Sequence, residues 1–441
     1  MQSSSLNRTA LLTALIISVL GLGEQLELLL PGKTTDSHFC SVVFAGAKVQ
    51  RKRNNGKKTS KSIPKVFCLN PEKLALSKAR LARGDKVLQP SLDNLLQEAD
   101  EALKAGPFSV MDKNLTPPSG DKHDYMSLGP YWWPDPKKPD GLPYIRRDGE
   151  VNPETRTNDT DRLAFGRMTS AVETLAGAWY FTDHKPYAAH AAGLLRVWFL
   201  DAATRMNPNL QFGQAIPGRT QGRDIGIIDT ARLCRLIDAI GLLETSDAWT
   251  AKDRLTIHDW CTAYLKWLRT SKHGLGEEKK HNNHGTWYDV QVVSLALFTG
   301  REDPARMILM RVKHLRIDKH IEPDGRQPHE LARTKSLSYS VMNLDGFFRL
   351  ALMGEKVGVD LWRYESEDGR SIRKALDFLA PYAKAEKKWP DKQISPYGPA
   401  NLFSLLRRGA IAYNDNRCED LISQIPPKEI ADSRTQLLWP R

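Results

Sequence analysis

The sequence of 441 residues lacks the short motifs that mark several common enzyme classes. It contains no GxSxG elbow, no P-loop, no complete GxGxxG and no HExxH. The first would expose a serine nucleophile, the next two would cradle phosphates, and the last would bind zinc. The sequence therefore gives no support to a serine hydrolase, a nucleotide-binding enzyme or a zincin protease.

Cysteine is also scarce, and its pattern excludes two further classes. The five cysteines are odd in number and form no CxxC pair, which indicates neither a disulfide scaffold nor a structural zinc site. We expect no metal and no other cofactor. A calcium site assembled from carboxylates far apart in the sequence stays open as an alternative.

The N-terminus lacks an apolar run of comfortable membrane-spanning length. The run Ala10–Leu22 follows the single basic residue Arg8 and is broken only by three small or polar residues. This pattern favours a signal peptide over residues 1–23, with a retained membrane anchor as the alternative. We therefore expect a secreted protein, periplasmic if the host is bacterial, without stable membrane association after the signal is removed.

Positive charge is concentrated near the N-terminus. The formal net charge is +12, and residues 1–66 carry ten Lys or Arg against three Asp or Glu, so +7 lies there and +5 in the rest. Mutual repulsion and the helix-breaking sequence at 54–56 predict a flexible linker over 24–66. It lacks the interleaved aromatic residues of a nucleic-acid site, so we expect no nucleic-acid partner. The mildly basic remainder suits an acidic polymer, although such an excess is also ordinary.

Residues 67–441 are expected to form one all-α domain. The sequence shows neither a strong strand alternation nor an internal repeat at solenoid spacing. Helical spacing of apolar residues recurs at 92–105, 165–179, 187–200, 227–243, 251–267, 305–315, 337–353, 372–380 and 401–412. Helices of this length joined by short turns pack as antiparallel pairs. The fold predicted is therefore an incomplete (α/α) toroid or barrel, with a cleft along the rim where the loops meet.

Three polar and aromatic stretches, 119–156, 211–229 and 322–339, interrupt the helical pattern. Long ordered loops in a compact domain are more often functional than idle. The residues predicted to bind substrate are His123, Tyr125, Tyr131, Trp132, Trp133, Arg219, Arg223 and Trp287. The tryptophans have an alternative role in the core, and the two arginines have an alternative role in pairing with Asp224 and Asp229.

The segment 281–291 holds three amides, two imidazoles, an indole, a phenol and a carboxylate just before the apolar run Val292–Phe298. One asparagine suffices to cap the helix that begins here. The other polar groups enter a buried helix, so they need partners or a ligand. We place the centre of the active site in this segment.

Four residues, Asn283, His284, Arg333 and Tyr339, suit the chemistry of β-elimination from a 4-linked polyuronate. That reaction removes the weakly acidic C5 proton beside a carboxylate, whose charge must first be neutralised. Amide, imidazole and guanidinium donors can neutralise it. A tyrosine beside an arginine can act as the base at C5 or as the acid at the leaving O4.

The same residues carry a resemblance to the alginate lyase family of helical-toroid polysaccharide lyases, spanning roughly 68–440. The matching pieces are Asn282-Asn283-His284 with Trp287, Glu330-Leu331-Ala332-Arg333 with Tyr339, His123-Asp124-Tyr125, Tyr131-Trp132-Trp133-Pro134 and Leu437-Leu438-Trp439-Pro440. The resemblance implies that Asn283, His284 and Arg333 neutralise the uronate carboxylate. It also implies that Tyr339 transfers the proton and that His284 shares the role of base.

We therefore expect a metal-independent polyuronate lyase that acts on an anionic polysaccharide. Arg333 and Tyr339 are six residues apart, one fewer than in the family, so alginate, glucuronan and other polyuronates all remain open substrates. One alternative is a glycoside hydrolase on the same scaffold, with carboxylates drawn from Asp124, Asp135, Asp289 and Glu330. Another is a non-catalytic binding protein for acidic polysaccharide. The sequence predicts no oligomeric state.

Overall fold

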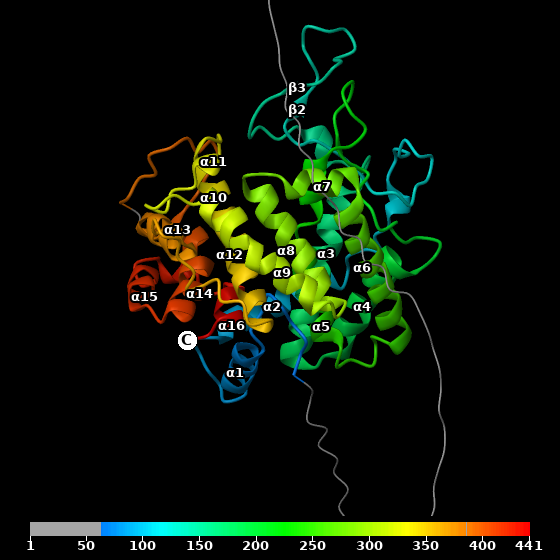
Figure 1. Cartoon of the computed structure of the whole chain (residues 1–441). Coiled ribbons are helices and arrows are strands. Elements are labelled where there is room, and N and C mark those ends of the chain that lie inside the picture. The colour runs from blue at the N-terminus through cyan, green and yellow to red at the C-terminus, as the bar shows by residue number, and fades with distance from the viewer. Residues whose placement is uncertain (1–62, 385) are drawn as a thin grey trace, which may run out of the picture. The chain divides into compact units, whose positions relative to one another are not determined.

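The computed structural model describes residues 63–384 and 386–441, which are mostly helical (Figure 1). The expected signal peptide, 1–23, and residues 24–62 of the expected linker lie outside the described residues. The end of that linker packs on the helical domain: Val66 is buried, and the N–H of the next residue, Phe67, donates to Asp238 Oδ1 over 2.6 Å.

The α-helices are α1 (Pro71–Leu81), α2 (Gln89–Ala102), α3 (Arg162–Thr182), α4 (Lys185–Leu195), α5 (Leu233–Leu243), α6 (Ala251–Thr270), α7 (Lys272–Glu278), α8 (Asn283–Phe298), α9 (Glu302–Val312), α10 (Asp318–His320), α11 (Pro328–Leu331), α12 (Ser336–Lys356), α13 (Ile372–Leu379), α14 (Phe403–Tyr413), α15 (Asn416–Ile422) and α16 (Arg434–Leu438). The strands are β1 (Met126–Leu128), β2 (Trp132–Trp133), β3 (Ile145–Arg146) and β4 (Phe212–Ala215).

The helices form the incomplete (α/α) toroid predicted from the sequence, without a closed barrel. α3 packs on α5, α5 on α8 and α8 on α12. Outside them, α4 packs on α3, and α6 and α9 pack on α8. The helix predicted at 227–243 is shorter than expected, because 224–230 forms a 3-10 helix (η4) before α5 begins. There, a Cβ on Gly226 would lie 2.3 Å from Gly213 O, so two backbones meet in this turn.

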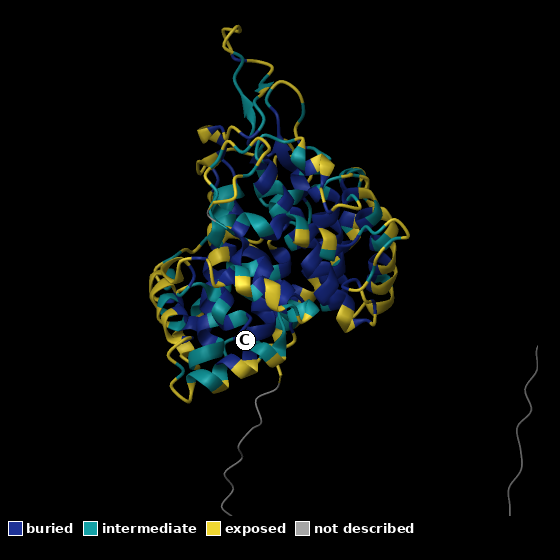
Figure 2. Ribbon diagram, turned by 90° about the vertical axis from the view of Figure 1, so that its left-hand side faces the viewer, coloured by how far each residue is buried: buried dark blue, intermediate teal, exposed yellow. Residues whose placement is uncertain are grey.

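α8 lies in the middle of the helices (Figure 1), and all its residues except His284 and Phe298 are buried. Figure 2 shows that buried residues fill the interior of the helical body and that the exposed ones lie mostly on its outer faces and loops. The apolar run of α8 explains its burial, because no face is left for water. Asn282 is the N-cap, and its side chain accepts from His284 N. A Cβ on Gly285 would lie 2.2 Å from Lys280 O, so only glycine allows this close approach.

Short strands that the sequence did not predict hold the loops at one rim. β1 pairs in parallel with β4, and β2 pairs antiparallel with β3 in the projecting loop of Figure 1. The first pair joins the stretch 119–156 to the stretch 211–229. Within the described residues, no helix is long and apolar enough to cross a membrane.

Candidate active site

Two polar groups, the Tyr131 hydroxyl and the Arg333 guanidinium, converge on the hydroxyl oxygen of Tyr339, in the first turn of α12. The hydroxyl groups of Tyr339 and Tyr131 lie 2.6 Å apart, and Arg333 Nη2 donates to Tyr339 Oη over 3.2 Å. The Arg333 guanidinium also lies 4.3 Å from the centre of the Tyr339 ring. A phenolate at Tyr339 would therefore be stabilised by one cation and one hydroxyl donor.

Arg333 is held by a carboxylate that the sequence analysis did not single out. Asp148, in the turn after β3, accepts from Arg333 Nη2 over 2.8 Å and from Arg333 Nε over 3.2 Å. Asp148 also accepts from Thr334 Oγ1 over 3.0 Å. Arg333 lowers the pKa of Asp148 well below its usual range, against the effect of burial. The projecting loop thus fixes the arginine beside Tyr339.

Asn283 is bonded to a second unexpected partner, Glu330 of α11. Asn283 N donates to Glu330 Oε1 over 2.5 Å, and Asn283 Nδ2 donates to Glu330 Oε2 over 2.7 Å. Both residues are buried, and burial raises the pKa of Glu330 while the bonds from Asn283 oppose that rise. Glu330 therefore sets the direction of the amide, and it also lies in electrostatic range of His284 and Arg333.

His284 is oriented by Glu277 of α7. His284 Nδ1 lies 2.7 Å from Glu277 Oε1, and the Glu277 side chain is 1% exposed. A carboxylate accepts here, so Nδ1 carries a proton, and Nε2 is the ring nitrogen left for a substrate. His284 is the residue of α8's first turn that stays partly exposed.

Replacing Glu277 by Gln should lower kcat by about tenfold, because the amide no longer fixes the imidazole tautomer. Glu278→Gln is the matched control, because Glu278 pairs with Arg311 near the surface. Steady-state kinetics on both variants would check this. Equal losses of kcat in the two variants would show that Glu277 has no specific role in catalysis.

The environment of Tyr339 predicts the pH dependence of the reaction. Burial raises the pKa of Tyr339, Tyr131 raises it further, and Arg333 opposes the rise. Arg333 thus lowers the pKa of Tyr339, but the net shift is upward. The reason is that the free-energy penalty of removing the phenolate from water is larger than its electrostatic stabilisation by Arg333.

If phenolate removes the C5 proton, kcat/KM should rise between about pH 6 and 9 by up to tenfold per unit without a plateau. The sign follows from the raised pKa, since the active, deprotonated form increases throughout the range below that pKa. A pH profile of kcat/KM on one polymer would test this. A flat or falling alkaline profile would move proton abstraction away from Tyr339.

Asp229 joins the two loops held by β1 and β4. It accepts from Ser127 Oγ over 2.5 Å, from Gln214 Nε2 over 2.9 Å and from Tyr125 Oη over 3.2 Å, and it pairs with Arg162. Gln214 adopts φ +50°, a left-handed conformation that is uncommon outside glycine. These bonds hold it there, and such strained residues cluster at functional sites.

Of the two predicted arginines, Arg223 is the more deeply placed. Its Nε donates to Gln214 O and its Nη2 to Gln214 Oε1, both over 2.9 Å. Burial lowers its pKa to about 10. Arg219 Nε donates to Tyr144 O over 2.8 Å. The alternative role of these arginines was pairing with Asp224 and Asp229. Among the described residues, neither guanidinium group hydrogen-bonds to either carboxylate.

The predicted aromatic residues divide into a rim group and a supporting group. Trp132 lies under Arg219 and Arg223, at 5.2 and 5.8 Å from the ring centre, and Trp133 lies under Arg147 at 4.9 Å. Trp287 is buried and donates to Met342 O.

Tyr125 and His123 lie further from the proposed chemistry. Tyr125 is fully buried, and its hydroxyl donates to Asp229 over 3.2 Å. His123 Nδ1 donates to Arg205 O over 2.6 Å, which ties this histidine to a neighbouring loop.

The carboxylates considered for a glycosidase have structural partners. Asp289 pairs with Arg316, whose guanidinium also donates to the carbonyl oxygens of Glu278 and Lys280. This set fixes the turn that delivers Asn283. Asp124 accepts from the Asn207 and Asn209 amides. Glu330 is committed to Asn283, as described above.

Electrostatic effects link several of these groups. Arg223 lies in electrostatic range of Glu277, and Arg162 lies in range of Tyr131 and Tyr339. Beside Arg162 is a cavity of about 600 Å³, whose lining includes Arg156, Asp229 and Trp287. Among the described residues, no group of three or more His, Cys, Asp or Glu is placed to hold a metal.

Comparison with known proteins points to one family and one fold. The family model described as alginate lyase matches residues 109–389. The crystal structure of an alginate lyase from Bacteroides ovatus is 42% identical, with a TM-score of 0.82, and the match covers 86% of this chain and 99% of that chain. No curated protein matches the chain.

A more distant neighbour shares the fold. Alginate lyase A1-III from Sphingomonas species A1 is 16% identical, with a TM-score of 0.54, over 83% of this chain and 94% of that chain. A histidine-to-alanine variant of that enzyme, complexed with a tetrasaccharide, aligns with a TM-score of 0.55 at 16% identity, over 86% of this chain and 98% of that chain.

Proposed function

This chain belongs to the alginate lyase family and is a polysaccharide lyase, and from that premise we propose that it cleaves a 4-linked polyuronate by β-elimination. The polymer is of the alginate (polymannuronate) or glucuronan type. The observation that carries the proposal is the convergence of Arg333 and Tyr131 on the hydroxyl oxygen of Tyr339.

In the proposed reaction, Asn283, His284 and Arg333 bind the carboxylate at C6 and neutralise its charge. The C5 proton then becomes more acidic, because the negative charge that develops at C5 and C6 meets fixed donors. Tyr339 phenolate takes this proton, and the C4–O4 bond breaks as the C4–C5 double bond forms. The phenol then returns the proton to O4, so protons and electrons balance.

Tyr131 and Arg333 support both states of Tyr339. They donate to the phenolate before the proton is taken, and Tyr131 can accept from the phenol afterwards. The indole rings of Trp132 and Trp133 are half-exposed at the rim, where aromatic faces suit the apolar faces of sugar rings. The neighbouring guanidinium groups of Arg219 and Arg223 suit the carboxylates of adjacent uronates.

An ultraviolet assay across a panel of uronic-acid polymers tests the proposal. We expect a product that absorbs in the ultraviolet from alginate, polymannuronate or glucuronan, because a lyase leaves a C4–C5 double bond. New reducing ends without that absorbance would indicate a glycoside hydrolase instead. Binding without either product would indicate a non-catalytic polysaccharide-binding protein.

We further propose that the chain is exported, which the run Ala10–Leu22 after Arg8 supports. Expression of the full chain in a secretory host should yield a mature protein in the medium or periplasm that has lost its first residues. N-terminal sequencing of that protein would check the cleavage. Retention of the intact chain in the membrane fraction would show an anchor instead.

A further inference from the structure

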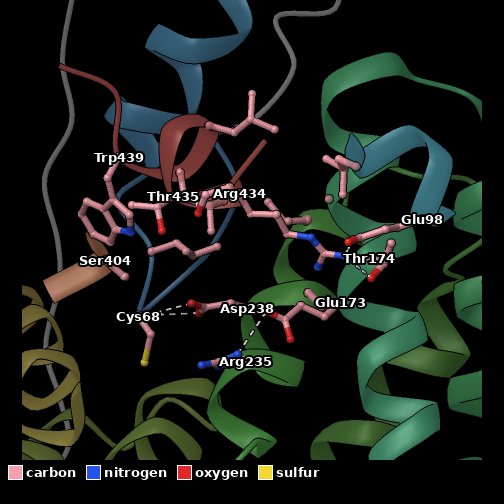
Figure 3. A pocket seen from close by; sticks show the side chains of 18 of the residues that line it. Cys68, Glu98, Glu173, Thr174, Arg235, Asp238, Ser404, Arg434, Thr435 and Trp439 are labelled. Carbon is pink, nitrogen blue, oxygen red and sulfur yellow. Dashed lines mark hydrogen bonds and ion pairs between the residues drawn. The ribbon is translucent and has the colours of Figure 1, made fainter. Parts of the chain in front are cut away.

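Residues 65–68, which we call the entry segment, run along one face of α5 where the chain enters the helical domain. A Cβ on Gly241 of α5 would lie 2.0 Å from Lys65 O, so the two backbones meet there. One turn earlier in α5, Asp238 Oδ2 accepts from Cys68 N over 3.0 Å (Figure 3). Gly241, Asp238 and Cys234 follow at three- and four-residue spacing, so they share one face of the helix. This path carries Cys68 to Cys234.

The thiols of Cys68 and Cys234 meet at the end of this path. The two residues are 3% and 0% exposed, and their thiols are hydrogen-bonded to each other. This bond lowers the pKa of Cys234, against the effect of burial. The same bond raises the pKa of Cys68, and burial raises it further. Two sulfur atoms from distant parts of the chain are therefore in contact.

The other described cysteines have no thiol beside them. Within 63–384 and 386–441, Cys261 and Cys418 are also buried thiols. Burial alone raises the pKa of Cys261. Burial also raises the pKa of Cys418, to about 11, and the groups that act on it besides burial are carboxylates and guanidiniums. The fold thus selects one pair of cysteines that their spacing in the sequence does not reveal.

We propose that Cys68 and Cys234 form a disulfide bond when the chain folds under oxidising conditions, which fastens the entry segment to α5. The oxidant is a small disulfide of the glutathione class. One cysteine thiolate attacks it and releases one glutathione, and the second cysteine then displaces the other glutathione from the mixed disulfide. Two cysteine thiols become one disulfide, one glutathione disulfide becomes two thiols, and the two cysteine protons end on those thiols.

Burial determines when this exchange takes place. An oxidant cannot reach a thiol that is fully buried, so the exchange precedes or accompanies the docking of the entry segment on α5. The finished disulfide is shielded from reducing thiols for the same reason. Because α5 packs on α3 and α8, the cross-link joins the start of the domain to its central helices. The proposed export would supply the oxidising compartment, whereas the lyase reaction does not bear on the cross-link.

Peptide mapping of the full chain tests the cross-link. The chain is expressed in bacteria with an oxidising cytoplasm, so that the result does not depend on export. Free thiols are alkylated in denaturant without reductant, before proteolysis and mass spectrometry. We expect one linked pair of peptides that contains Cys68 and Cys234, lighter by about 2 Da than the two thiol peptides, with Cys261 and Cys418 alkylated. Alkylation of both Cys68 and Cys234, or a link from either to another cysteine, would overturn the proposal.

Thermal unfolding measures what the cross-link contributes to stability. The oxidised protein should melt about 5 °C above the same protein purified from a reducing cytoplasm, because the bond closes a long loop of the unfolded chain. Cys261→Ser is the matched control, because it alters a buried cysteine outside the pair, and it should keep this difference. Cys234→Ser should lose the difference. If Cys234→Ser does not fold, Cys68→Ser provides the same comparison, and a difference that persists in the folded variant would contradict the cross-link.

Discussion

Tyr339→Phe should reduce kcat by about 10²–10⁴-fold, the usual contribution of one acid or base. The substitution removes a single oxygen, on which Tyr131 and Arg333 converge. The ring remains, so packing in the first turn of α12 and contact with the Arg333 guanidinium are retained. KM should change little. Single-turnover and steady-state assays with the ultraviolet readout would measure both quantities.

Tyr364→Phe is the matched control for this substitution. Tyr364 Oη donates to Asp318 over 2.8 Å, so it loses an equivalent hydrogen bond outside the proposed site. Its turnover should stay at the level of the unaltered enzyme. If Tyr339→Phe folds, as judged by circular dichroism, and turns over normally, Tyr339 is not the proton-transfer residue.

The order of the helices could be predicted from the sequence, because the spacing of apolar residues indicates which face of a helix is buried. The pattern at 372–380 predicted α13, and the pattern at 337–353 predicted most of α12. The short strands were not predictable in this way. β1 and β4 are brief, and their pairing depends on Asp229, which gathers both loops through Ser127 and Gln214.

The supporting residues of the site escaped the sequence analysis for a related reason. Glu277 precedes His284 by seven residues, in a separate helix, and Asp148 is far in sequence from Arg333, so no local spacing reveals either contact. Glu330 was visible within its motif, but as a candidate glycosidase acid rather than the partner of Asn283. A carboxylate's role depends on its partner, which only the fold supplies.

The net pKa direction of Tyr339 is another property that the fold decides. The sequence places an arginine near the tyrosine, which by itself favours the phenolate. The structure adds burial and Tyr131, which together outweigh that effect. The tyrosine is therefore held as a phenol at rest and is ready to protonate the leaving O4. For Tyr339 to act as the base, Tyr131 and Arg333 must stabilise its phenolate when substrate is bound.

Asn283→Ala and Arg333→Ala should each reduce kcat by about 10²–10³-fold, as expected for donors that meet charge in the transition state. Asn282→Ala is the local control, because Asn282 caps α8 and its amide is not proposed to contact substrate. Melting temperatures should accompany the kinetics, because Asn283 also satisfies the buried Glu330 carboxylate.

A methyl-esterified polymer separates the roles of the two donors, because its C6 group carries no charge to neutralise. The penalty of Asn283→Ala should be smaller on the ester than on the acid, because only the charge that develops in the transition state remains for the amide to meet. Arg333→Ala should retain part of its penalty, because Arg333 Nη2 also donates to Tyr339 Oη and supports the phenolate. Ratios of kcat/KM for acid and ester substrates would measure the difference. If both variants are equally impaired on the acid and on the ester, charge neutralisation is not what these residues contribute.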